Sequence, residues 1–162
     1  MLETVISNTT PLITLMGLGE LRLLKHFYTK VIIPQAVYEE VEQGRSRSAY
    51  QPVAEIDWIE VRPVQQMTSV GYLLDTLDRG EAEVIVLAGE LQAGRGLLDE
   101  KAARHVASFH GIPYTGTLGI LLKARQEGVI PALAPLLTRM TENGIWISDT
   151  LRMSVLRQAN EL

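Results

Sequence analysis

The sequence contains no cysteine among its 162 residues. This absence excludes disulfide bonds, thiolate zinc sites and a cysteine nucleophile, and it fits a reducing cytoplasm, which is the expected location. No stretch approaches the 18 uninterrupted apolar residues of a membrane span, and the opening MLETVISNTT has no basic segment before a long apolar stretch. We therefore expect neither a signal peptide nor a membrane contact.

Positive charge is also scarce, because 15 Lys and Arg residues stand against 19 Asp and Glu residues and the formal net charge is −4. A protein that neutralises phosphates over a broad surface is usually basic. Any contact with nucleic acid should therefore depend on a local patch, and a basic partner chain fits this charge equally well.

Several nucleotide-binding and catalytic motifs are missing as well. The chain has no G-x-G-x-x-G, no G-x-x-x-x-G-K-[ST] and no G-x-S-x-G sequence, which gives no support for a nucleotide cofactor or a serine nucleophile. Its three histidines, His26, His105 and His110, are scattered and are expected to be surface or packing residues.

What the chain does have is a repeated alternation of short apolar runs with helical patterns. The predicted strands cover 2–6, 31–33, 56–61, 97–98, 112–114 and 145–147. The predicted helices cover 11–18, 34–43, 79–91, 101–109, 117–126, 131–142 and 148–160. The polar segment 44–55 is expected to be an exposed loop. With 46 % hydrophobic residues, this alternation predicts one α/β domain over 1–162, with a mainly parallel sheet and helices on both faces.

Two polar residues directly follow predicted strands. Asn8 comes after the first strand, and Asp99 comes after Leu97 and Leu98. Ligand sites in parallel sheets form at the carboxyl ends of the strands, so both side chains should lie at the same edge. The alternative for Asp99 is a helix N-cap, a role that aspartate fills well.

Two glutamates are expected to point inward from helices. In helix 34–43, Ala36, Val37 and Val41 cover one arc of about 140° and Glu40 falls inside it. A carboxylate among core-facing residues needs a counter-charge, hydrogen bonds or a metal. The alternative is that Glu40 lies at the margin of this face and reaches water.

In helix 79–91, Glu83 and Glu90 define a polar stripe, and Glu81 points the opposite way, between Ile85 and Ala88. We therefore expect Glu81 to face inward and Glu83 to face outward. The alternative is that both acids of the first turn simply favour the positive end of the helix dipole. Oxygen ligands without cysteine or suitably spaced histidine select a hard cation, Mg²⁺ or Mn²⁺.

Five segments in this order resemble PIN-domain proteins, and most closely the PIN-like branch of unknown function. They are VISNTTPLI, PQAVYEEV, LDRGEAEVIVLA, LLDEKAAR and GIPYTGTLGILLKARQEGVIPA. The resemblance implies a three-layer α/β/α fold around a short parallel sheet. It also implies an acidic cluster that binds Mg²⁺ or Mn²⁺ and, in active members, cleavage of single-stranded RNA. Many members are toxins of toxin–antitoxin pairs, silenced by a small partner protein and commonly dimeric.

Carried over by position, the family's four acids fall on Asn8, Glu40, Glu81 and Asp99. Supporting positions fall on Thr9, Thr115 and Thr117, and Glu100 is a second candidate ligand beside Asp99. The first acid is replaced by the amide of Asn8, which can coordinate a cation but brings no negative charge. Glu81 stands where aspartate is more usual, which lengthens that arm by one methylene.

The function expected from this resemblance is a metal-dependent endoribonuclease of PIN type that acts as the toxin of a toxin–antitoxin pair and forms a homodimer. Four cations would receive the RNA phosphates, or would serve only solubility: Arg45, Arg47, Lys101 and Arg104. The alternative is a catalytically weakened module that binds nucleic acid or a partner protein. A third option, a small-molecule phosphohydrolase, is disfavoured because no nucleophilic aspartate motif follows the first strand.

Overall fold

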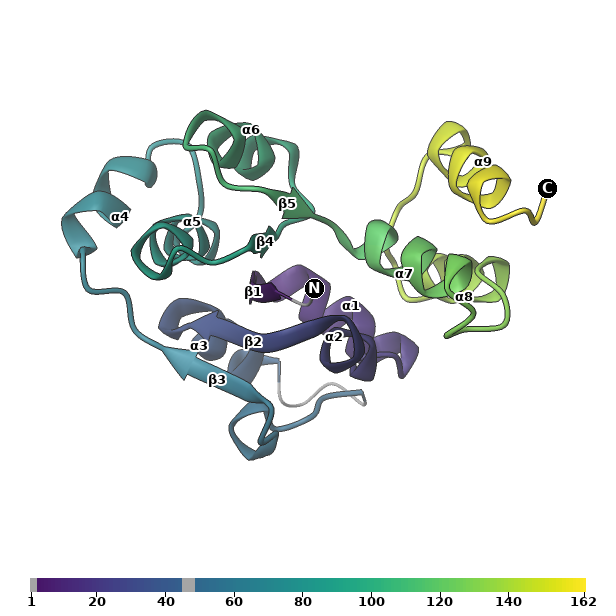
Figure 1. Ribbon diagram of the computed structural model, residues 1–162, viewed down its shortest axis with the longest axis horizontal. Coiled ribbons are helices and arrows are strands. Elements are labelled where there is room, and N and C mark those ends of the chain that lie inside the picture. The colour runs from purple at the N-terminus through teal and green to yellow at the C-terminus, as the bar shows by residue number, and fades with distance from the viewer. Residues whose placement is uncertain (1–2, 45–48) are drawn as a thin grey trace.

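A computed structural model describes residues 3–44 and 49–162. Its centre is a five-stranded sheet in the order β3-β2-β1-β4-β5, in which every neighbouring pair is parallel (Figure 1). The strands are β1 (Glu3–Ser7), β2 (Tyr28–Pro34), β3 (Ile59–Arg62), β4 (Arg95–Leu97) and β5 (Tyr114–Thr115). The predicted α/β fold with a parallel central sheet flanked by helices is confirmed.

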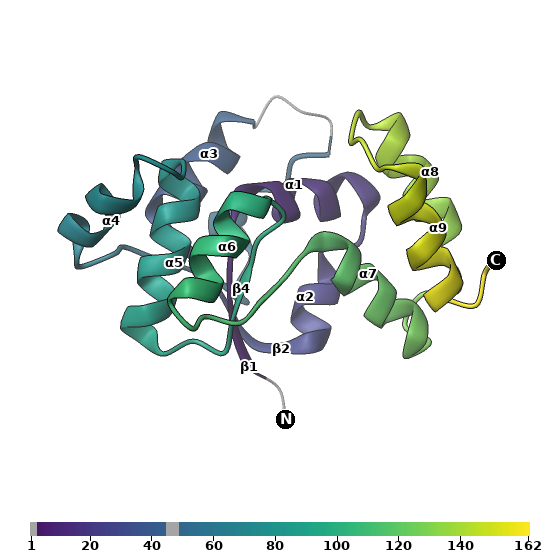
Figure 2. The ribbon, with the colours of Figure 1, turned by 90° about the horizontal axis from the view of Figure 1, so that it is seen from above.

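The helices that connect these strands cover the sheet and extend beyond it. They are α1 (Thr9–Leu18), α2 (Arg22–Phe27), α3 (Gln35–Gln43), α4 (Met67–Leu73), α5 (Arg79–Leu91), α6 (Lys101–Phe109), α7 (Thr117–Gln126), α8 (Ala134–Glu142) and α9 (Asp149–Gln158), with a short 3₁₀ turn at Val53–Glu55. Figures 1 and 2 show α4, α5 and α6 grouped on one side and α7, α8 and α9 on the other. In the described part of the chain, no helix is both long and apolar enough to cross a membrane.

The core is built on the central strands. Val5 and Ile6 of β1, Ile33 of β2 and Leu97 of β4 have no exposed surface. Strands of a parallel sheet are covered on both faces, so they read as continuous apolar runs in the sequence. Burying one such side chain fully contributes about 1.5–3 kcal/mol. This burial fixes the strand ends from which the polar residues of the carboxyl edge project.

Three predicted helices, 79–91, 101–109 and 117–126, have the predicted limits at both ends. The predicted strand 145–147 is wrong, because these residues form a linker without regular secondary structure between α8 and α9. Its alternating pattern is real, since Ile145 and Ile147 are half-buried and Trp146 is exposed, but no neighbouring strand pairs with it. Helices α2 and α4 were not predicted, because six or seven residues give too short a periodic pattern.

Candidate acidic site at the carboxyl edge of the sheet

Asn8 lies where β1 ends and α1 begins. Its backbone N–H donates to the carbonyl of Leu97 at 3.1 Å, which joins the end of β1 to the end of β4. The side chain is only 5 % exposed. Asn8 occupies the N-cap position of α1, but its side chain makes no capping hydrogen bond. The usual structural reason for asparagine at this position is therefore absent.

Asn8 and Glu40 meet over a glycine of α5. A Cβ atom at Gly80 would lie 2.7 Å from Glu40 Oε1 and 3.0 Å from Asn8 Oδ1. These two oxygens, from the N-cap of α1 and from α3, therefore approach the same point above the first turn of α5. Any side chain at position 80 would collide with them. Gly80 was not among the predicted site residues, although a glycine in the first turn of a helix was a visible signal.

Burial raises the pKa of the Glu40 carboxyl, and the charge of Asp78 raises it further, whereas the hydroxyl of Thr9 lowers it. Oγ1 of Thr9 is buried and has no hydrogen-bond partner of good geometry among the described residues. The hydroxyl thus lies near enough to favour the charged form of Glu40 without making a well-formed hydrogen bond. An orphaned buried hydroxyl beside a carboxylate is an observation that a bound ion or water would explain.

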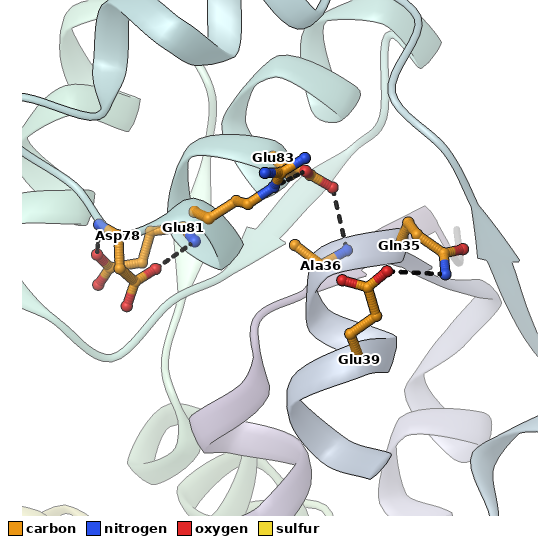
Figure 3. A network of polar contacts seen from close by, with 7 residues as sticks. Gln35, Ala36, Glu39, Asp78, Glu81 and Glu83 are labelled. Atoms are coloured by element: carbon orange, nitrogen blue, oxygen red, sulfur yellow. Dashed lines mark hydrogen bonds and ion pairs between the residues drawn. The ribbon is translucent and has the colours of Figure 1, made fainter. Parts of the chain in front are cut away.

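Glu81 is 6 % exposed and takes part in a capping box with Asp78. Its Oε1 accepts the Asp78 N–H at 3.0 Å, while Asp78 Oδ1 accepts the Glu81 N–H at 2.8 Å (Figure 3). Glu81 therefore also stabilises the first turn of α5, as the alternative interpretation of this acid expected. Burial nevertheless raises the pKa of Glu81; the Asp78 backbone hydrogen bond lowers it, and the charges of Asp78, Glu100 and Glu40 raise it further. Three carboxylates therefore raise the pKa of Glu81: Asp78 at the start of the same helix, Glu40 in α3 and Glu100 at the start of α6.

Asp78 is an acid that the sequence reasoning missed. It is exposed at the start of α5, and its charge acts on both Glu40 and Glu81. The signal was present, because an acid followed three residues later by glutamate before an apolar run is a capping-box pattern.

Asp99 is held by a helix far from it in sequence. Its Oδ1 accepts the Thr117 N–H and its Oδ2 accepts the Thr117 hydroxyl, both at 2.7 Å. Asp99 therefore caps the first turn of α7, whereas Glu100 occupies the N-cap position of α6. Thr117, predicted as a supporting residue, orients this carboxylate. Thr115 lies in β5, where its carbonyl accepts the N–H of Leu98 at 2.8 Å.

Arg104, one of the four predicted cations, lies beside Asp99. Its Nε donates to the Leu98 carbonyl at 2.9 Å, and its guanidinium lies over the Tyr114 ring, 5.3 Å from the centroid. Both Arg104 and Asp99 approach Gly116. Lys101 is exposed at the start of α6. Arg45 and Arg47 lie outside the described residues.

The expectation that Glu83 points outward is wrong. Glu83 is only 2 % exposed, and its carboxylate accepts the Ala36 N–H at 3.1 Å and the Arg79 Nε–H at 3.0 Å (Figure 3). The helical wheel assumed one buried face, but α5 packs against α3, α4 and α6 as well as the sheet. Glu83 therefore ties the first turn of α3 to α5, where a negative charge is favourable.

The candidate site thus brings Asn8, Glu40 and Glu81 around the first turn of α5, with Asp99 at the end of the neighbouring strand. Over residues 3–44 and 49–162, no three acidic or histidine side chains are grouped tightly enough to form a metal site as they stand. The donors themselves fit a hard divalent cation, because all are carboxylate, amide or hydroxyl oxygens. Like charges that raise each other's pKa also favour a bound cation.

A parallel α/β sheet with an oxygen-rich acidic edge defines a class of proteins whose site lies beyond the carboxyl ends of the strands. A family model described as a PIN domain matches residues 4–161, and the chain belongs to the PIN-domain family. PIN domains are nuclease-type modules that generally depend on a divalent metal. None of the curated proteins compared with the chain matches it.

Proposed function

We propose that this protein is a metal-dependent endoribonuclease that cleaves single-stranded RNA with Mg²⁺ or Mn²⁺. The observation that carries the proposal is the approach of Asn8 Oδ1 and Glu40 Oε1 to one point over Gly80. Glycine at position 80 leaves room for these two oxygen donors, which come from different parts of the chain. The raised pKa values of Glu40 and Glu81 supply the second support, because burial and neighbouring acids outweigh the groups that favour the charged form of each carboxyl.

In this proposal Asn8, Glu40, Glu81 and Asp99 hold the cation. A divalent cation supplies a more acidic water and stabilises the negative charge that develops on a phosphate. Thr117 fixes the orientation of Asp99 through two hydrogen bonds. Arg104, fixed against Leu98 and Tyr114 beside Asp99, and the exposed Lys101 face the RNA phosphates. For Arg45 and Arg47, phosphate contacts are proposed from the sequence alone.

The wider biological setting is also a proposal. We infer a cytoplasmic toxin of a toxin–antitoxin pair, built as one domain, that forms a homodimer and is silenced by a small antitoxin-like protein. The acidic net charge of −4 favours a basic segment in that partner.

The test is incubation of the purified protein with labelled single-stranded RNA, in Mn²⁺ or in EDTA. Glu40→Gln should lower the cleavage rate about 100-fold or more, since loss of one preorganised charge-stabilising group commonly has this effect. Glu39→Gln is the matched control. Glu39 is the exposed neighbour on the same helix, hydrogen-bonded only to Gln35 in the described contacts, and its variant should cleave at the wild-type rate. Equal rates in Mn²⁺ and EDTA, or equal rates for both variants, would contradict the proposal.

A specific observation favours a second function, a binding module without catalysis. The first acid of the quartet is an amide, and the acids of the described residues do not form a ready-made metal group. In this case the protein would bind single-stranded RNA or a partner protein with the same affinity in Mn²⁺ and in EDTA, and no product would form.

A further inference from the structure

A cavity of about 530 Å³ lies directly beside the acidic site. It runs from Asp99 and Glu100 at the end of β4, past the start of α7, to Trp146 in the linker between α8 and α9. Its volume falls within the range of about 300–1,000 Å³ that is typical of small-ligand pockets. The cavity therefore has room for a group of nucleotide size next to the candidate metal ligands.

Trp146 lies in a short segment with a backbone hydrogen bond on one side and a helix cap on the other. On one side, Gly144 adopts a φ of +89° and the Ile145 N–H donates to the Met140 carbonyl at 2.9 Å. On the other side, Ser148 Oγ caps α9 by accepting the Leu151 N–H at 3.1 Å. Ile145 and Ile147 pack against the core, whereas Trp146 between them is exposed.

The indole of Trp146 is 84 % exposed. Two other aromatic side chains are equally exposed, Tyr72 at 80 % and Phe109 at 83 %. Among the exposed aromatic residues of the described chain, only Trp146 lines the cavity that reaches Asp99. Trp146 is therefore exposed beside the candidate site, whereas Phe109 is exposed outside this cavity.

The chemistry of the walls favours a nucleobase over a phosphate. The lining includes the apolar side chains of Leu122 and Met140 and the hydroxyl-bearing residues Thr10 and Thr14. The lining has two carboxylates, Asp99 and Glu100, and a single cation, Arg104. This charge balance favours a neutral base inside the cavity, where it could stack on the indole and hydrogen-bond to the hydroxyls.

We propose that this cavity is a base-binding subsite, in which Trp146 stacks on a base of single-stranded RNA whose neighbouring phosphate lies at the acidic edge. The inference rests on the proposed ribonuclease function. It explains how an acidic protein holds RNA: base stacking supplies the affinity that phosphate neutralisation cannot. It also gives a physical reason for selecting single strands, because bases in a duplex are already stacked.

The experiment measures RNA binding separately from cleavage. A Trp58→Phe variant leaves Trp146 as the only tryptophan, because the chain has two. A short adenosine RNA is titrated in EDTA while tryptophan fluorescence is followed, and stacking should quench it. By polarisation of a labelled RNA, Trp146→Ala should weaken binding about 5- to 150-fold, the range for losing one stacked base. Trp146→Phe should retain most of the affinity.

Phe109→Ala is the matched control, since it removes an equally exposed aromatic side chain outside the cavity, and it should bind as the wild type does. A second RNA lacks its bases but keeps the sugar–phosphate chain. Its binding should be weak and insensitive to Trp146→Ala.

Unchanged RNA binding by Trp146→Ala overturns the inference, even if the variant no longer binds a protein partner. An equal loss of affinity for the abasic RNA overturns it as well. If wild-type protein cleaves RNA but Trp146→Ala binds normally, the subsite alone fails. If wild-type protein binds through Trp146 but never cleaves in Mn²⁺, the ribonuclease proposal alone fails.

Discussion

Two regions of the molecule treat their carboxylates in opposite ways. After α9, Glu161 accepts hydrogen bonds from the N–H groups of Leu133 and Ala134, at 2.6 and 3.0 Å, and pairs with Arg125 at 3.1 Å. Burial tends to raise the pKa of Glu161, but these donors outweigh burial and the pKa is lowered. This carboxylate stabilises the start of α8 as an ion.

At the carboxyl edge of the sheet the balance is reversed. Glu40 and Glu81 have raised pKa values, because burial and neighbouring acids outweigh the nearby Thr9 hydroxyl at Glu40 and the Asp78 backbone hydrogen bond at Glu81. In the described part of the chain, no arginine or lysine is among the causes that shift the pKa of either carboxyl. A structural carboxylate such as Glu161 has enough donors to lower its pKa, so carboxyls whose pKa stays raised are candidate ligands for a cation.

Asp99 lies at the carboxyl edge of the sheet, but like Glu161 it accepts hydrogen bonds from the start of a helix. Asp99→Ala should lower the free energy of unfolding by about 3 kcal/mol, because two hydrogen bonds to a charged acceptor are lost and the start of α7 is left uncapped. Asp99→Asn keeps an oxygen for the Thr117 N–H and should lose about half as much. Urea unfolding in EDTA measures both. A loss for alanine no larger than for asparagine would show that the Thr117 bonds do not hold α7.

Glu161→Gln should cost about 1–2 kcal/mol at neutral pH, a value reduced by the partial exposure of the pair. The folded-state pKa lies below the ordinary value of 4.5. The stabilisation is therefore complete above pH 4.5 and disappears as pH falls through the folded-state pKa. Thermal unfolding of both proteins over this range should show the difference shrinking on acidification. A constant difference would mean that Glu161 acts through packing rather than charge.

Asn8→Asp would add a carboxylate beside Glu40, in a position that is 5 % exposed. In EDTA the variant should be less stable by about 1 kcal/mol, the cost of one further like charge. In Mn²⁺ it should regain this stability and bind the ion more tightly. Melting temperatures with and without Mn²⁺ measure both effects. Gained cleavage would identify Asn8 as an attenuating residue, and destabilisation that Mn²⁺ fails to reverse would argue against a cation at this position.

Glu40→Gln should have the smallest effect on stability, within about 0.5 kcal/mol or slightly stabilising in EDTA, because it removes a charge that the fold leaves uncompensated. The folded-state pKa of Glu40 lies above 4.5, so the wild type loses stability as pH rises from 4.5 through that pKa, and the variant should lose less. Denaturant titrations at several pH values, in EDTA, check the sign. A large destabilisation would place Glu40 with Glu161 as a structural acid.

Much of the fold could be predicted because its signals are local. Helix 79–91 has a capping box at its start, and helix 148–160 was expected from Ser148, whose hydroxyl does cap α9. The prediction for 145–147 failed because alternation indicates an extended chain but does not supply a strand to pair with. Glu83 was misplaced for a related reason, since a helical wheel cannot know how many neighbours a helix will have.

The candidate site was predictable in part. The parallel topology correctly placed Asn8 and Asp99 at adjacent strand ends. Gly80 and the pairing of Asp99 with Thr117 could not be found in this way, because the contacting residues lie 40 and 18 positions apart in the chain. The roles of the site residues, the partner and the homodimer stay predictions.

The sequence by itself determined most of the alternation of strands and helices, the oxygen-only chemistry of the candidate ligands and the acidic charge of the chain. It did so because periodicity, capping and composition are properties of neighbouring residues. Only the tertiary structure decided which carboxylates are compensated. The donors for Asp99 and Glu161 come from Thr117, Leu133 and Ala134, and no local pattern records that these distant groups meet.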